Sequence, residues 1–352
     1  MKRIKALRIY KWIILSTVLQ VIMLLFFNNI YLNSRGEATM IPIPSDNQKT
    51  SKQVINVSIP ENATDIKVSF DSGYVGYMMD ENLEIYDIKA KKVAKSISLK
   101  KDIITNYHWL TDRSTLVYAT RTPDEGPGSV QIITYSMDTE VQHDYPKITG
   151  LPRKSEIVSV ELSHLTNTIY TLVKTSETEA KIYRYNVMSQ LFHISNTSAD
   201  TIIKNMYYRD KLVYQDNKSN KVGIFTWTDP KGTTEALTIK NKAVLLGVAG
   251  SEDEIYFGEL NGDKKISKIV YGKEGEDPDN LWKNVTLKAP VLPENLILSS
   301  GGDIYELVES KKMVYNISKN IELTYKGKLI EVTDKQIVSL DNKELKITEI
   351  AN

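Results

Sequence analysis

The sequence contains no cysteine, only four histidines and almost no excess of charge of either sign. Without cysteine the chain forms no disulfide, thiolate zinc site, cysteine nucleophile or lipid-modified cysteine anchor. The 45 basic and 44 acidic residues give a formal net charge of +1. This balance argues against a nucleic-acid-binding protein, because such domains are strongly basic. The hydrophobic fraction of 41% and the charged fraction of 25% are typical of a folded globular protein.

The sequence also lacks the short motifs of common catalytic and cofactor sites. It contains no Gly-x-Ser-x-Gly elbow, glycine-rich phosphate loop or nicotinamide-binding fingerprint. The histidines are too scattered to form the His-x-x-x-His pair of a zinc site. They are His108, His143, His164 and His193. The sequence therefore predicts no catalytic residue, no cofactor and no metal site.

One long apolar run is present, over residues 12–32, and it carries no charge. A helix of that length covers ~31 Å at ~1.5 Å per residue, which matches the ~30 Å hydrocarbon core of a bilayer. The preceding residues 1–11 contain five basic residues and no acid. Because cations flanking a membrane span stay in the cytoplasm, we predict a single transmembrane helix at the cell membrane, with residues 1–11 as a cytoplasmic tail. The rest of the chain is then extracytoplasmic.

A cleaved signal peptide is the alternative for this N-terminal region. Gly36-Glu37-Ala38 offers a small-x-small cleavage site. The apolar run is nevertheless longer than the ~7–15 residues of a signal-peptide core, which favours a retained anchor. Residues 33–52 are polar, contain Pro42 and Pro44 and show no periodicity. They predict a flexible tether between the membrane and an outer domain.

Residues 53–352 contain a repeated strand in which an aliphatic residue precedes tyrosine, directly in five copies and as Val75-Gly76-Tyr77 in the first. The tyrosines of the six clear copies are Tyr77, Tyr118, Tyr170, Tyr214, Tyr256 and Tyr305, with spacings of 41, 52, 44, 42 and 49 residues. A seventh, degraded copy is Gln336-Ile337-Val338. Apolar strands precede and follow each copy, and a more polar fourth strand, such as Val93–Ser98, usually comes next.

Four strands in about 43 residues are typical of one β-propeller blade, and 300 residues hold about seven such units. We therefore predict an all-β, seven-bladed β-propeller preceded by one transmembrane helix. Six or eight blades remain possible, as do an open β-sandwich and two stacked barrels. The last copy, within residues 328–350, supplies only three strands. Residues 54–59 alternate apolar and polar residues and are predicted to close the ring as its fourth strand, which removes two exposed sheet edges.

Two segments carry a family resemblance. Trp109-Leu110-Thr111-Asp112-Arg113-Ser114 precedes the strand of Tyr118, and Phe70-Asp71-Ser72-Gly73 precedes that of Tyr77. This pattern resembles the WD40-like repeat of TolB-type and dipeptidyl-peptidase-IV-type propellers, although the proline of that repeat is missing here. The resemblance implies a propeller whose Asp/Gly turn forms a hairpin and whose aromatic residue packs between blades. It implies neither family's activity, and the chain has no room for the peptidases' catalytic domain.

The leading interpretation is a non-catalytic binding, scaffold or sensory module for an envelope protein, a peptide or a cell-wall ligand. Long loops on a rigid scaffold commonly bind ligands. Three loops, at residues 120–129, 146–156 and 288–294, are predicted to meet on one face of the propeller. The candidate contact residues are Arg121, Asp124, Glu125, Arg153 and Lys154.

Two alternatives remain. The first is an extracytoplasmic enzyme of hydrolase, lyase or lactonase type, whose site would lie in the central channel. Its candidate residues are Lys67, His108, Glu161 and Asn205. The second is a structural subunit of a secretion or sporulation assembly, held in place by the transmembrane helix.

Overall fold

The structure is a computed structural model, and its chain divides into two units, Met1–Thr50 and Ser51–Asn352. The residues that it describes are 12, 15–21, 23–24, 54–123, 126–163, 166–219, 221–228 and 231–350.

The N-terminal unit is described only in part. Within the predicted membrane segment 12–32, the described residues 12, 15–21 and 23–24 are helical. Among the described residues, no helix has both the length and the apolar character that a membrane crossing requires. The remainder of that segment, the predicted tail 1–11 and the predicted tether 33–52 lie outside the described residues. The anchor and its signal-peptide alternative therefore stay predictions.

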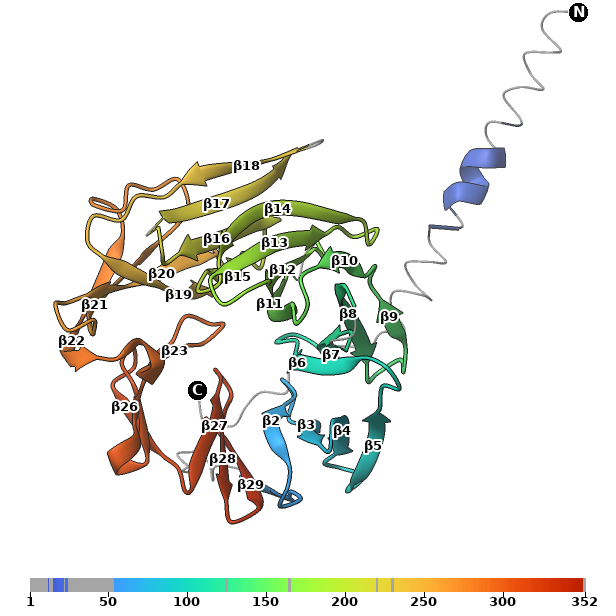
Figure 1. The fold of residues 1–352 in the computed structure, drawn as a ribbon, viewed down its shortest axis with the longest axis horizontal. Coiled ribbons are helices and arrows are strands. Elements are labelled where there is room, and N and C mark those ends of the chain that lie inside the picture. Colours follow the sequence, from blue (N-terminus) through green and yellow to red (C-terminus); the bar gives the residue numbers. More distant parts are fainter. Residues whose placement is uncertain are drawn as a thin grey trace, which may run out of the picture. The chain divides into compact units, whose positions relative to one another are not determined.

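The second unit forms seven antiparallel sheets arranged in a ring, which confirms the prediction of an all-β, seven-bladed propeller (Figure 1). Blade one contains β2 (Thr64–Val68), β3 (Tyr74–Met79), β4 (Asn82–Asp87) and β5 (Lys92–Ile97). Blade two contains β6 (Ile103–Trp109), β7 (Thr115–Arg121), β8 (Gly128–Ser136), β9 (Gln142–Asp144) and β10 (Ile148–Leu151). Blade three contains β11 (Glu156–Leu162), β12 (Ile169–Lys174), β13 (Glu179–Tyr185) and β14 (Leu191–Ser198).

The remaining blades follow the same order from the inside to the outside of the ring. Blade four contains β15 (Ile202–Asn205), β16 (Lys211–Asp216), β17 (Lys221–Thr228) and β18 (Lys231–Ala236). Blade five contains β19 (Ala243–Ala249), β20 (Glu254–Leu260), β21 (Ile266–Gly272) and β22 (Lys283–Val291). Blade six contains β23 (Leu296–Leu298), β24 (Ile304–Val308), β25 (Met313–Asn316) and β26 (Ile321–Thr324). Blade seven contains β27 (Lys328–Val332), β28 (Gln336–Asp341), β29 (Glu344–Glu349) and β1 (Val54–Ser58).

The first strands of neighbouring blades lie against each other around the centre, as Figure 1 shows for β27, β2 and β6. The described core consists of seven clusters of buried side chains, one between each pair of adjacent blades. The repeated tyrosines belong to these clusters; Tyr118, Tyr170 and Tyr305 are almost fully buried. Each blade is thus stabilised mainly by its two neighbours and not by a core of its own.

The aromatic residue of the repeat lies between blades. Trp109, at the end of β6, is 7% exposed and belongs to the cluster between blades one and two. Its ring stacks on Tyr74 with a centroid distance of 6.1 Å. Its Nε1 donates a hydrogen bond of 3.2 Å to the carbonyl of Lys67 on blade one. One side chain therefore holds two innermost strands together.

The ring closes through β1, which comes from the N-terminal end of the described propeller. This strand pairs antiparallel with β29, from Val54 opposite Thr348 to Ser58 opposite Glu344. Val57 is buried in the cluster between blades seven and one, together with side chains of β3, β28 and β29. The strand thereby supplies both backbone hydrogen bonds and core packing at the closure interface, by which we mean the contact between blades seven and one.

A pair of matched substitutions tests this closure. Val57→Ala should lower the free energy of unfolding by about 1–2 kcal/mol, because it removes two buried methyl groups. Val54→Ala, on the same strand but 49% exposed, should change it by less than about 0.5 kcal/mol. The measurement is denaturant unfolding of the full chain. Equal effects of the two substitutions would show that β1 is not packed as described.

Candidate functional site

The innermost strands of five blades carry a titratable side chain at their penultimate position. These side chains, which we call the channel layer, are Lys67, His108, Glu161, Lys204 and Glu331. Blades five and six have Val248 and Ile297 at the same position. Because side chains alternate along a strand, the residue that follows each of these turns away from the channel. The layer contains two cations, two carboxylates and one imidazole.

Most polar groups of the channel layer bind other groups of the channel wall. Glu161 and Lys204 form an ion pair of 2.8 Å between blades three and four. The charge of Glu161 raises the pKa of Lys204, against the opposing effect of burial. Lys67 donates a hydrogen bond of 2.6 Å to the carbonyl of Tyr107 and forms an ion pair of 3.1 Å with Asp65. The contacts of Lys204 with Glu161 and of Lys67 with Tyr107 join neighbouring innermost strands.

His108 lies in the same layer in its neutral form. Burial, together with the charges of Lys67 and Lys204, lowers the pKa of His108 to about 4. The imidazole therefore stays uncharged at neutral pH. Because a base with so low a pKa is weak at neutral pH, His108 is poorly suited to act as a general base.

Asn205, one of the four channel candidates, does not belong to the channel layer. It is 4% exposed and donates hydrogen bonds to the carbonyls of Leu162 and Met206. Side chains alternate along β15, so the side chain of its neighbour Lys204 lies in the channel layer and that of Asn205 does not. In the part of the chain that the structure describes, no hydrogen bond joins any two of the candidates Lys67, His108, Glu161 and Asn205. Among these residues there is also no group of three carboxylates or histidines that could hold a metal ion.

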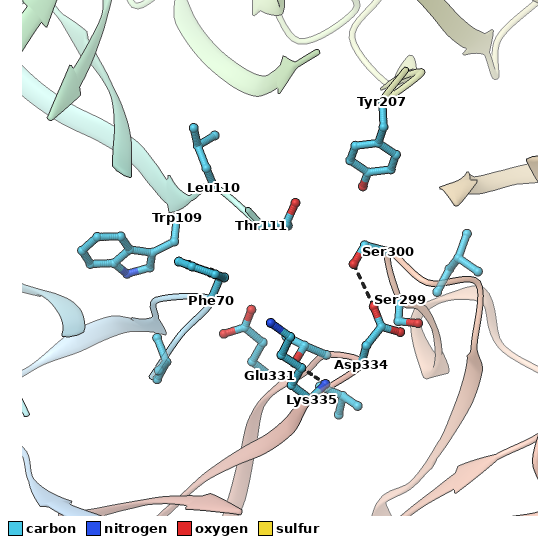
Figure 2. A pocket seen from close by; sticks show the side chains of 14 residues that line it. Phe70, Trp109, Leu110, Thr111, Tyr207, Ser299, Ser300, Glu331, Asp334 and Lys335 are labelled. Carbon is cyan, nitrogen blue, oxygen red and sulfur yellow. Dashed lines mark hydrogen bonds between the residues drawn. The ribbon is translucent and has the colours of Figure 1, made fainter. Parts of the chain in front are cut away.

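A cavity of about 220 Å³ opens at one end of the channel, and we call it the mouth cavity. It is built from the segments that follow the innermost strands of blades one, two, four, six and seven. Figure 2 shows Tyr207 pointing into it from one side, with Phe70, Glu331 and Lys335 gathered on another. Its lining residues are Val68, Phe70, Trp109, Leu110, Thr111, Tyr207, Leu298, Ser299, Ser300, Glu331, Val332, Thr333, Asp334 and Lys335.

Hydrogen bonds between blades fix the turns around the mouth cavity. Asp253, in the β19–β20 turn, is almost fully buried and accepts hydrogen bonds from the backbone N–H groups of Tyr207 (2.7 Å) and Tyr208. Asp334, in the β27–β28 turn, accepts hydrogen bonds from Ser300 Oγ (2.8 Å) and the N–H of Gly301 (2.7 Å). The cavity thus has a rigid frame, although each turn is short.

Asp71 plays the same part at the turn of blade one. It accepts a hydrogen bond of 3.0 Å from Ser114 of blade two and further bonds from Ser69 and the N–H of Gly73. Burial alone would raise the pKa of Asp71, but these hydrogen bonds outweigh it and lower the pKa. The aspartate of the repeat is therefore a residue that joins blades.

Glu331 is the member of the channel layer that reaches the mouth cavity. The backbone N–H of Val68, across the closure interface, is near enough to its carboxylate to favour the charged form. Its Oε2 is buried and has no hydrogen-bond partner among the described residues. Burial raises the pKa of Glu331, while the backbone N–H of Val68 and the charge of Lys67 act in the opposite direction.

The five candidate loop residues lie at the other end of the channel, or outside the described residues. Asp124 and Glu125 are not described. Arg121 ends β7 and pairs with Ile103, at the opposite end of β6 from Trp109. Arg153 and Lys154 are exposed in the turn between β10 and β11.

Two of the three predicted loops do lie side by side. A Cβ atom on Gly128, at the start of β8, would lie 2.1 Å from the carbonyl oxygen of Pro152. Only glycine permits this close approach of the two backbones. The third predicted loop, residues 288–294, is wrong in part, because Lys283–Val291 forms the outermost strand β22. Its Pro290 is tolerated there because an edge strand has an N–H side that faces solvent.

Comparisons with known proteins found distant similarities to solved structures. No protein-family model and no curated protein matches the chain. The β-propeller domain of Cps50 (Swd1) from Myceliophteria thermophila is similar in structure, with a TM-score of 0.49 and 10% identity, over 86% of this chain and 100% of that one. The WD40 domain of SCAP from fission yeast has a TM-score of 0.47 and 13% identity, over 82% of this chain and 85% of that one. The seven-bladed assignment rests on the strand pairing described above. A β-propeller is a fold commonly used as a binding or scaffold module.

A double-mutant cycle tests whether the channel ion pair stabilises the ring. Glu161→Gln and Lys204→Met should each destabilise the fold by about 1–2 kcal/mol, with a coupling energy of about 1 kcal/mol. The control cycle uses Glu61→Gln and Lys343→Met, which remove an ion pair of the same 2.8 Å length whose side chains are 80% and 56% exposed. Its coupling should stay below about 0.5 kcal/mol. Similar couplings in the two cycles would contradict a stabilising role for the channel pair.

Proposed function

We propose that this chain is a membrane-tethered, extracytoplasmic binding module that holds an envelope protein, a peptide or a cell-wall ligand at its mouth cavity. One observation carries the proposal. Turns of five different blades converge on the mouth cavity, and hydrogen bonds accepted by buried or partly buried aspartates hold those turns in place. A concave site on a rigid frame binds with little loss of conformational freedom, which favours affinity.

The contacts of the channel residues support binding rather than catalysis. Glu161 is paired with Lys204, and Lys67 with Asp65 and a backbone carbonyl. Groups with such partners hold strands together, and a catalytic site instead needs acids and bases that converge on a reacting atom. We therefore place the ligand at the mouth and assign Lys67, Glu161 and Lys204 of the channel layer to the stability of the ring.

The position of β1 supports the choice of the mouth over the opposite loop face. Thr348 of β29 pairs with Val54 of β1 on one side and with Ile337 of β28 on the other. Ile337 is paired in turn with Val332, which lines the mouth cavity. The polypeptide therefore enters the propeller at the mouth end. A tether that starts at this end favours contact between the mouth and a partner that is itself bound to the membrane.

The test compares one bulky substitution on each face. Ser300→Trp places a large ring at the rim of the mouth cavity, and Arg153→Trp places the same ring on the loop face; both native side chains are exposed. Each full-length variant is purified from cross-linked membranes, and the captured proteins and wall fragments are identified by mass spectrometry. Ser300→Trp should reduce capture of the partner by about tenfold or more, and Arg153→Trp should leave it unchanged.

The opposite pattern, with loss only in Arg153→Trp, would place the ligand on the loop face. Hydrolysis of wall fragments by the wild-type chain, with no partner captured, would overturn the binding-module proposal in favour of an enzyme. Both variants are first compared with the wild type by thermal unfolding, so that a loss of capture is not a loss of fold.

A further inference from the structure

The mouth cavity contains one buried polar atom that the described residues leave unsatisfied. Glu331 lines the cavity, and its Oε2 is buried without a hydrogen-bond partner among them. A buried polar atom in this state costs free energy, and a charged one costs more. A ligand that donates a hydrogen bond to this carboxylate recovers that cost on binding.

Apolar side chains form part of the wall of the mouth cavity, between polar ones such as Thr111, Ser299 and Thr333. Val68, Leu110, Leu298 and Val332 line it together with the ring of Phe70. Its volume of about 220 Å³ is below the ~300–1,000 Å³ of pockets for drug-sized ligands. The space therefore suits one long side chain better than a whole small molecule.

The ring of Phe70, which lines the cavity, is already in contact with the ammonium group of Lys335. Lys335 Nζ lies 5.3 Å from the centroid of the Phe70 ring. An aromatic face attracts cations through its quadrupole, so this wall is compatible with a second cationic group from a ligand. Asp334 adds negative charge to the same cavity, although one of its oxygens is already engaged by Ser300 and Gly301.

We propose that the mouth cavity binds the cationic side chain of a lysine or arginine residue of the ligand, with Glu331 as its counter-ion. This inference rests on the proposed function, since it names the chemistry of the group that the binding module recognises. The aliphatic stem of such a side chain packs on the apolar walls, and its charged end donates to the carboxylate. A lysine or arginine head group only donates hydrogen bonds, and the unsatisfied Oε2 of an ionised Glu331 only accepts them.

The first experiment uses three small probes and the purified full-length chain. N-acetyl-lysine methylamide carries the ammonium group, N-acetyl-norleucine methylamide carries the same stem without it, and N-acetyl-glutamate methylamide carries a negative charge. Dissociation constants are measured by ligand-observed NMR. The lysine probe should bind about tenfold or more tightly than the other two, the factor that a charge-assisted hydrogen bond contributes.

The second experiment removes the charge of the counter-ion. Glu331→Gln preserves the size of the side chain and should weaken binding of the lysine probe about tenfold or more, without weakening the norleucine probe. The control is Glu322→Gln, which changes an exposed carboxylate on the peripheral strand β26. It should leave all three dissociation constants unchanged. Thermal unfolding checks that both variants are folded.

A third variant, in which Glu331 is unchanged, tests whether the group bound in the cavity is a cation or an anion. Lys335 is exposed at the rim of the cavity, and its charge repels an incoming cation. Lys335→Met should therefore tighten binding of the lysine probe by a factor of about two to five, since the interaction of exposed charges is weak. If the cavity instead recognises an anion, the same variant weakens binding of the glutamate probe.

The affinity for the lysine probe should also depend on pH. Because burial raises the pKa of Glu331, the carboxylate becomes neutral at a higher pH than an exposed glutamate does. Binding of the lysine probe should weaken as the pH falls through that pKa, and binding of the norleucine probe should not. The other charged or titratable groups near Glu331 or in the same cavity are Lys67 on β2, Tyr107 on β6, Tyr207, and Asp334 and Lys335 in the β27–β28 turn. The Glu331→Gln titration separates their contribution, because the pH dependence should be absent from that variant.

The outcomes separate this inference from the proposed function. Equal affinity for the lysine and norleucine probes, tighter binding of the glutamate probe, or no binding of the lysine probe would overturn the cation site. If Ser300→Trp still abolishes capture of the partner in that case, the binding module stands and only its ligand chemistry is wrong. If Glu331→Gln has no effect although the lysine probe binds, Glu331 is not the counter-ion and the inference fails.

Discussion

The pairing of β1 with β29 is the interaction on which the rest of the propeller depends. Every core cluster lies between two blades, so a blade with one open side loses half of its apolar packing. The chain has no disulfide with which to fasten its ends. It uses one strand instead, taken from the N-terminal end of the described propeller and paired with the last strand of the ring. The same strand places Val57 in the core.

The mouth cavity is built across this same closure interface. The carboxylate of Glu331 in blade seven lies near the backbone N–H of Val68 in blade one, and Lys335 lies over the ring of Phe70. Gln336 of blade seven also accepts a hydrogen bond from Ser72 of blade one. The wall that carries the unsatisfied carboxylate therefore exists only when the ring is closed. Closure and recognition are in this sense parts of one structural unit.

The repeat made the fold predictable because the second strand of each of blades one to six carries a tyrosine that packs between blades. These tyrosines lie on the second strand of each of these blades, and the number of residues between successive tyrosines indicated the number of blades. The site was less predictable. Lys204 was missed in favour of Asn205 because β15 has only four residues, too few for its alternation to be read with certainty.

The mouth cavity could not be found from the sequence for a different reason. It is formed by a few residues from each of five separate turns, and no local pattern connects them. Glu331 belongs to the degraded seventh repeat, which has no tyrosine to mark its register. The binding site was predicted on the proline-rich loops because their composition is distinctive. The turns that form the mouth cavity are short and ordinary in composition.

Native-state hydrogen exchange tests the central claim, that ring closure by β1 is part of the cooperative fold, most directly. The experiment compares the amides that bond β1 to β29 with the amides of β16 in blade four, in the full chain. If closure holds the ring together, both sets exchange only through global unfolding and give the same free energy of opening. Exchange of the β1 amides through a separate opening of much lower free energy, while β16 stays protected, would contradict it.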